Sequence, residues 1–162
     1  MNADAFRYFY EYHFAENRKT WDWYITSLTQ EQFTQPVAYS VGSVRDHIVH
    51  LTNVEESWFS ELRGVEVPQW IDPADVADRD EIRARWDRVE QMMRDYLATL
   101  RDEMLFEKPV AEGEDKDLLA WQMLLHVANH ATDHRAQILR ILGDLGVRTG
   151  PQDFMFYVYD HP

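Results

Sequence analysis

The chain has 162 residues, of which 45 % are hydrophobic and 28 % are charged, a composition typical of one globular domain. Lys and Arg number 16 against 29 Asp and Glu, so the formal net charge is −13. A field of that sign repels phosphate groups, which argues against nucleic-acid and anionic-membrane partners. The complete absence of cysteine excludes disulfides, thiolate metal ligands and a cysteine nucleophile.

Targeting and membrane segments are not recognisable in the sequence. The N-terminus lacks the basic segment and apolar run of a signal peptide. No stretch reaches the roughly 20 apolar residues that cross a bilayer. Internal repeats, low-complexity tracts and linkers are also missing. We therefore expect a cytoplasmic protein with no membrane partner, built as a single domain over residues 1–162.

Apolar residues recur at helical spacings of three and four in four segments of the chain. These segments cover residues 2–28, 43–64, 78–100 and 117–145. Two of the starts carry an N-cap signature, Ser43 with Asp46 and Asp78 with Glu81. Gly146 suits the position just after the last helix. Four helices joined by fairly short loops predict an all-α fold, a four-helix bundle.

The tail beyond Gly146 carries an aromatic run over residues 154–159. This run is too apolar to be left in water, and we expect it to pack on the domain or on a second subunit. As a strand it would have no pairing partner.

Five of the seven histidines fall into two of the helical segments. The fourth segment carries His126, His130 and His134, each four residues after the last. A spacing of four turns a helix by about 400°, so neighbouring pairs stack on one face and can chelate one ion. His126 and His134 are about 12 Å apart along the axis, too far to bind the same ion. The spacing therefore allows either of two pairs to bind the ion, His126 with His130 or His130 with His134.

A third ligand has to come from another helix. His47 and His50 lie three residues apart in the second segment and share one side of it. Glu55 and Asp133 are the carboxylate alternatives. A set of imidazoles without thiolate suits Zn, Ni, Fe, Cu or Co rather than Ca or Mg. Three protein ligands also leave coordination positions open, which is typical of a catalytic metal site.

The remaining histidines and motifs point to no other chemistry. His13 and His161 have no histidine neighbours, and we expect both to be structural or exposed. The sequence contains no nucleophile elbow, no glycine-rich phosphate loop, no HExxH motif and no pair of Glu-x-x-His motifs on two helices.

Two runs of the sequence resemble the motifs of the DinB-like (DinB/YfiT) superfamily. The first is residues 42–51 (GSVRDHIVHL), followed by Glu55 and Trp58; the second is residues 125–138 (LHVANHATDHRAQI). The likeness extends over essentially the whole chain, including Phe154 in the tail. Ala136 stands where the family most often has Gly, a departure that should leave the ligands unaffected.

The resemblance implies an up-and-down four-helix bundle, often dimeric, with a divalent metal in its core. In the family one His of the second helix and an H-x-x-x-H pair of the fourth hold the ion, and they correspond here to His50, His130 and His134. His47 and His126 then become neighbours of the site, and Glu55 is a candidate to orient a ligand or bound water. We expect zinc or nickel first, with iron, manganese or cobalt as alternatives.

The superfamily includes mycothiol-dependent isomerases, bacillithiol S-transferases and many proteins without an assigned activity. The resemblance therefore implies a metal-dependent enzyme, a thiol-dependent S-transferase or a related transferase or hydrolase, with a low-molecular-weight thiol as cosubstrate. The alternative is a non-catalytic metal-binding or stress-response protein. A homodimer is expected in either case.

Overall fold

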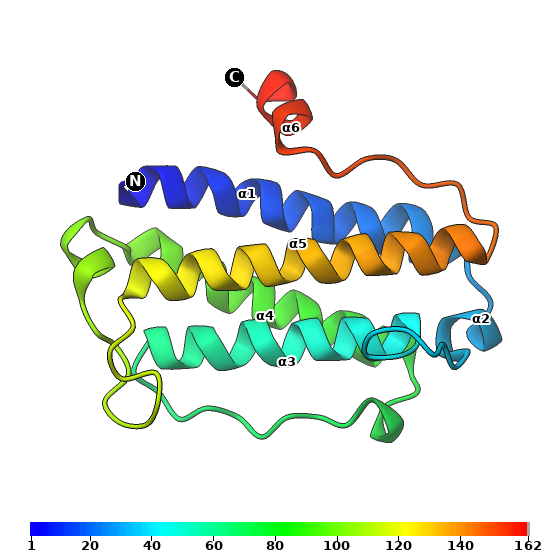
Figure 1. The fold of residues 1–162 in the computed structure, drawn as a ribbon, viewed down its shortest axis with the longest axis horizontal. Coiled ribbons are helices and arrows are strands. Elements are labelled where there is room, and N and C mark those ends of the chain that lie inside the picture. Colours follow the sequence, from blue (N-terminus) through cyan, green and yellow to red (C-terminus); the bar gives the residue numbers. More distant parts are fainter. Residues whose placement is uncertain (162) are drawn as a thin grey trace.

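The computed structural model describes residues 1–161, and within them every regular element is helical. The α-helices are α1 (Ala3–Lys19), α2 (Gln30–Thr34), α3 (Val44–Leu62), α4 (Arg79–Thr99), α5 (Ala120–Asp144) and α6 (Phe154–Asp160). The four long helices lie side by side (Figure 1), with α3 against α4 and α5, and α1 against the same two helices. The prediction of an all-α fold is confirmed. Among the described residues, no helix combines the length and the apolar character needed to cross a membrane.

The long helices do not alternate in direction, so the expected up-and-down topology is wrong. Along α3 and α4 the contacts rise together, from Asn53 with Arg85 to Phe59 with Tyr96, which makes these two helices parallel. In Figure 1, α1 and α5 run from left to right, whereas α3 and α4 run from right to left. The connection over residues 63–78 is the physical reason. Its 16 residues span about 50 Å when extended, enough to return along a 19-residue helix of about 28 Å.

Local signals set the starts of two long helices as predicted. The Ser43 hydroxyl accepts a hydrogen bond from the backbone N–H of Asp46, whose carboxylate accepts one from the N–H of Ser43. Asp78 accepts the N–H groups of Asp80 and Glu81 in the same way at the start of α4. Helix α5 begins at Ala120, a little later than predicted, and Gly146 follows its end with φ of +82°.

The first predicted helix changes its geometry in its last third. Helix α1 ends at Lys19 and continues as a π-helical turn over Thr20–Tyr24 and a 3-10 turn over Ile25–Ser27. Trp21 and Tyr24 within this segment are buried, and the Trp21 ring packs edge-on against Trp86 of α4. A π turn holds one residue more than an α turn and so changes which side chains face the core.

The interior divides into two apolar clusters along the helix axes. One surrounds Phe6, Phe59 and Met93, and the other surrounds Ile48 and Ile138. Where one cluster gives way to the other, each of α1, α3 and α5 contributes buried polar side chains: His13, Asn17, Glu55, His134 and Arg135. These five polar side chains therefore form a layer inside the protein rather than a surface patch.

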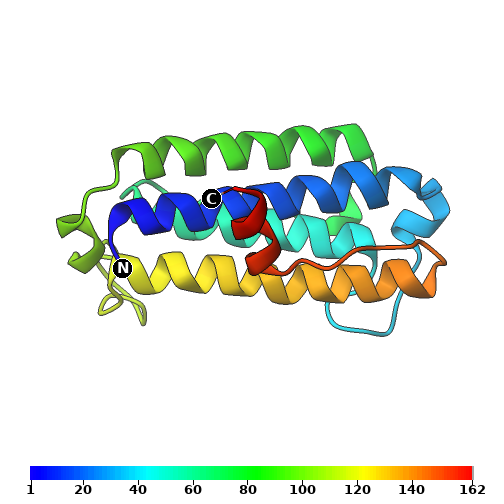
Figure 2. The same ribbon diagram turned by 90° about the horizontal axis from the view of Figure 1, so that it is seen from above.

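The C-terminal tail returns across the domain and packs on α1 (Figure 2). The ring of Phe154 makes edge contacts with Phe9 and Tyr12. Other side chains of α6 face solvent, with Phe156 52 % and Tyr159 69 % exposed. The tail thus packs on the domain as predicted, and a further apolar surface is left uncovered.

Candidate metal centre

Three histidine side chains from two helices converge at one point. His50 comes from α3, and His130 and His134 come from α5. The Nε2 atoms of His50 and His130 are 3.2 Å apart, and one ring nitrogen of each of the three residues lies within 4.8 Å of the others. Two nitrogen ligands at about 2.05 Å from a tetrahedral ion are about 3.3 Å apart. The three side chains fit one divalent ion and could hold it.

The antiparallel register of α3 and α5 decides which histidines meet. His47 lies beside His134, His50 beside His130, and Trp58 beside His126. His126 is therefore opposite a tryptophan two turns from His50, and it is exposed to solvent. Of the two pairs that the spacing left open, the structure brings 130/134 together with His50.

The carboxylates considered as ligands lie elsewhere. Asp133 is exposed and accepts a hydrogen bond from the side-chain amide of Gln137. Glu55 is buried and lies one turn of α3 beyond His50, but its described hydrogen bonds come from α1 and α4. The cluster that could hold a metal is thus made of imidazoles alone.

The imidazoles are neutral at pH 7, the state that a metal ligand requires. Burial, followed by the neighbouring His134 and His50, lowers the pKa of His130 to about 4. Burial and His134 also lower the pKa of His50, and burial lowers that of His134. Each ring therefore has a free nitrogen lone pair at neutral pH.

A fourth histidine, His47, lies directly behind the triad. It is fully buried, and its Nδ1 is 3.1 Å from Nδ1 of His134. Its Nε2 has no hydrogen-bond partner among the described residues. Burial, with His134 and His50 next, lowers the pKa of His47 to about 4, so this ring is neutral as well.

Glu55 is the acceptor of a buried network that adjoins the triad. Its carboxylate accepts hydrogen bonds from His13 Nε2 at 3.0 Å, Trp86 Nε1 at 3.0 Å and Asn17 Nδ2 at 3.2 Å. Burial alone would raise the pKa of Glu55, but the bonds from His13, Trp86 and Asn17 lower it below its ordinary value. None of these bonds reaches the triad, so Glu55 does not orient a metal ligand by direct hydrogen bonding.

Arg135, the residue after His134, is the cation of this network and is 0 % exposed. Its guanidinium donates to Asn17 Oδ1 at 2.7 Å, Thr132 Oγ1 at 3.0 Å and Gln152 Oε1 at 3.0 Å. It also lies 3.3 Å from Nδ1 of His13, which therefore accepts and leaves Nε2–H to donate to Glu55. His13 is therefore a buried structural residue, which was one of the two alternatives predicted for it.

Sequence reasoning did not foresee this network. His13 and Asn17 are four residues apart on a face of α1 that is otherwise apolar, with Phe6 and Tyr10 on it. A polar pair at that spacing on an apolar helix face is the signal that could have identified it. Its partner on α5 is 118 residues away from Asn17 in the chain, and no local pattern indicates that.

A cavity of about 360 Å³ opens beside His50. It is lined by Val41, Asp46, His50, Asn53, Trp70, Ile71, Asp72 and Pro73. The Asn53 side chain donates to the carbonyl oxygen of Ile71 and accepts its N–H, which fixes the returning loop to α3. Trp70 is thereby held edge-on to His50, with ring centres 5.7 Å apart. The loop that makes α3 and α4 parallel also provides one wall of this cavity.

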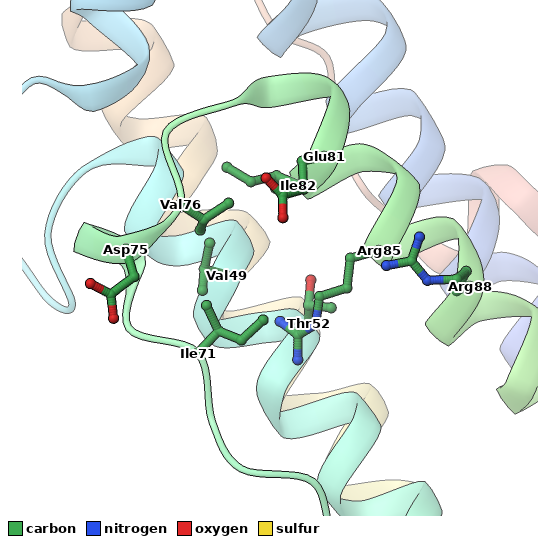
Figure 3. A pocket seen from close by; sticks show the side chains of 9 residues that line it. All are labelled: Val49, Thr52, Ile71, Asp75, Val76, Glu81, Ile82, Arg85 and Arg88. Atoms are coloured by element: carbon green, nitrogen blue, oxygen red, sulfur yellow. The ribbon is translucent and has the colours of Figure 1, made fainter.

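A second cavity, of about 290 Å³, lies between α3, α4 and the same loop (Figure 3). Val49, Ile71, Val76 and Ile82 form its apolar part. Its charged lining has both signs, with Asp75 and Glu81 against Arg85 and Arg88. It contains no histidine, and the mixed charges favour no one class of ligand.

Comparison with known proteins agrees with the motifs that carry the triad. The sequence model of the DinB family matches residues 1–161, which include both histidine-bearing runs. No curated protein matches the chain. Since the match spans all but the last residue, the chain belongs to the DinB family.

Proposed function

We propose that the protein binds one divalent metal ion through His50, His130 and His134 and acts as a metal-dependent enzyme. The reaction class is thiol-dependent S-transfer or a related transfer or hydrolysis. One observation carries this proposal: three neutral imidazoles from two helices meet beside a cavity of about 360 Å³. Membership of the DinB family supports it.

The donor set indicates which ions suit the site. Imidazoles without thiolate or carboxylate favour zinc or nickel, with iron, manganese or cobalt as alternatives. Three protein ligands leave coordination positions open for a substrate. An ion held there would lower the pKa of a thiol or water molecule bound at an open position.

The chain's own residues define what a substrate meets. Since there is no cysteine, a thiolate nucleophile has to come from a low-molecular-weight cosubstrate. Trp70 and Val41 offer apolar surface beside His50, and Asp72 adds a carboxylate. The amide of Asn53 is already engaged by Ile71, so it maintains the wall rather than binding a substrate.

The proposal extends to the organisation of the protein. We retain a single four-helix-bundle domain over residues 1–162, and the lateral packing of the four long helices supports it. The exposed side chains of Met155, Phe156 and Tyr159 on α6 support a homodimer. A net charge of −13 supports the absence of a nucleic-acid partner, and we keep the cytoplasm as the proposed location.

Turnover by the metal-loaded protein tests the proposed activity. The assay combines protein loaded with zinc or nickel, cysteine as the thiol and 1-chloro-2,4-dinitrobenzene as the electrophile, followed by ultraviolet absorbance. We expect thiol-dependent turnover that is lost on chelation and in His130→Ala, and that persists in His161→Ala, whose side chain is exposed in the tail. A protein that binds the ion without accelerating thiol transfer or hydrolysis supports the non-catalytic alternative.

A further inference from the structure

His47 makes one contact that relates it to the metal centre. Its ring packs against that of His134 with centres 5.3 Å apart, and the two Nδ1 atoms are within hydrogen-bond distance at 3.1 Å. The residue is 0 % exposed, and its Nε2 is the buried side-chain atom without a partner in the described part of the chain.

The contact determines where the protons lie. Two neutral imidazoles that meet through their Nδ1 atoms share one proton between them. Because Nδ1 of His134 faces His47, Nε2 is the nitrogen that His134 has left for an ion. A ligating Nε2 carries no proton, so the proton of His134 is on Nδ1 and is donated to the lone pair of His47 Nδ1. His47 then carries its own proton on Nε2, the atom without a partner.

If folding were the only requirement, a His47 ring with an unpartnered Nε2–H would be unfavourable. A buried N–H without an acceptor destabilises the folded state, and an apolar side chain of similar size would avoid that penalty. Departures from the rules of stable packing are expected at functional sites. The one described interaction that an apolar residue could not reproduce is the hydrogen bond with His134.

We propose that His47 is a positioning residue of the metal centre, which fixes the tautomer and ring orientation of His134 by accepting its Nδ1–H. The inference rests on the proposed metal-binding function. Histidine ligands usually donate their second N–H to a carboxylate, a backbone carbonyl or water. Here a neutral imidazole takes that place, so it orients the ligand without adding negative charge to the site.

Two substitutions of His47 separate positioning from packing. His47→Leu removes the acceptor, and His47→Asn keeps an acceptor oxygen near the position of Nδ1. Zinc affinity is measured against a competing chelator. We expect the affinity to fall about ten- to hundredfold in His47→Leu and to stay within about threefold of the wild type in His47→Asn. Urea unfolding of the metal-free His47→Leu protein should show a midpoint at or above the wild-type value.

A spectroscopic measurement on the wild type tests the proposed tautomers of His134 and His47 without any variant. In zinc-loaded protein labelled with ¹⁵N in histidine, long-range ¹H–¹⁵N correlations report which ring nitrogen carries the proton. We expect the Nδ1–H tautomer for His134 and the Nε2–H tautomer for His47. If zinc binds and His134 has its proton on Nε2, or His47→Leu binds as tightly as the wild type, the positioning role is wrong while the proposed function stands. If the wild type binds no ion, the proposed function itself fails.

Discussion

Replacing Arg135 with methionine removes the cation of the buried network while keeping much of its apolar volume. The guanidinium is fully buried and donates to Asn17, Thr132 and Gln152. Methionine fills such space flexibly but donates nothing. The substitution therefore tests whether the charged layer between the two apolar clusters stabilises the fold.

The structure gives the size of the effect. Asn17 Oδ1 loses its 2.7 Å donor, and a buried polar atom left without a partner costs about 1–3 kcal/mol. Thr132 Oγ1 and Gln152 Oε1 lose their donor as well, and a hydrogen bond to a charged group contributes about 1.5–3 kcal/mol. Because these losses overlap, we expect the free energy of unfolding to fall by about 2–4 kcal/mol in total.

Urea unfolding followed by circular dichroism measures this change as a lower midpoint at unchanged slope. Arg140→Met is the matched control on the same helix. The ion pair of Arg140 with Asp144 has side chains 71 % and 67 % exposed, so its loss should change stability by no more than about 0.5 kcal/mol. A loss below about 1 kcal/mol in Arg135→Met would refute the stabilising role of the network.

Three further predictions follow from other parts of the structure. The metal-free protein should lose stability as the pH falls from about 6.5 to about 4, because the pKa values of His47 and His130 are about 4 when folded and higher when unfolded, so the unfolded state takes up protons first. Constant urea midpoints across that window would contradict it. Asn53→Ala should destabilise the fold by about 1–3 kcal/mol and expose the loop at Ile71 to proteolysis, and an unchanged digestion pattern would show that the loop is held otherwise. We propose a homodimer that packs through α6, so the molar mass measured by light scattering should be lower for Phe156→Asp than for the wild type; equal masses would show that Phe156 is not in the interface.

Local features of the sequence were sufficient to predict most of the helices. Ser43 and Asp78 mark helix starts through hydrogen bonds to residues two or three positions ahead, and such contacts depend on little else in the chain. Direction is a different matter. The sequence predicts a loop over residues 65–78, but nothing local indicates that this loop returns along the helices and makes α3 and α4 parallel.

The site depends on contacts between residues far apart in the chain. The spacing of His126, His130 and His134 gives two equivalent pairs, and the choice between them follows from how α5 lies against α3. The resemblance to the DinB-like superfamily implies His130 and His134, and the contacts with His50 agree with that pair. The spacing of His13 and Asn17 could have indicated a buried polar pair on α1, but no local pattern indicates that Arg135, 118 residues after Asn17, is its partner.

Metal content is the most direct test of the central claim. Protein without a histidine tag is stripped of metal, reloaded with zinc, dialysed and measured by inductively coupled plasma mass spectrometry. We predict one ion per chain in the wild type and essentially none in His130→Ala, with the helical circular dichroism of the variant preserved because apolar packing carries most of the stability. A wild type that retains no ion, or a folded His130→Ala protein that retains as much as the wild type, would contradict the account.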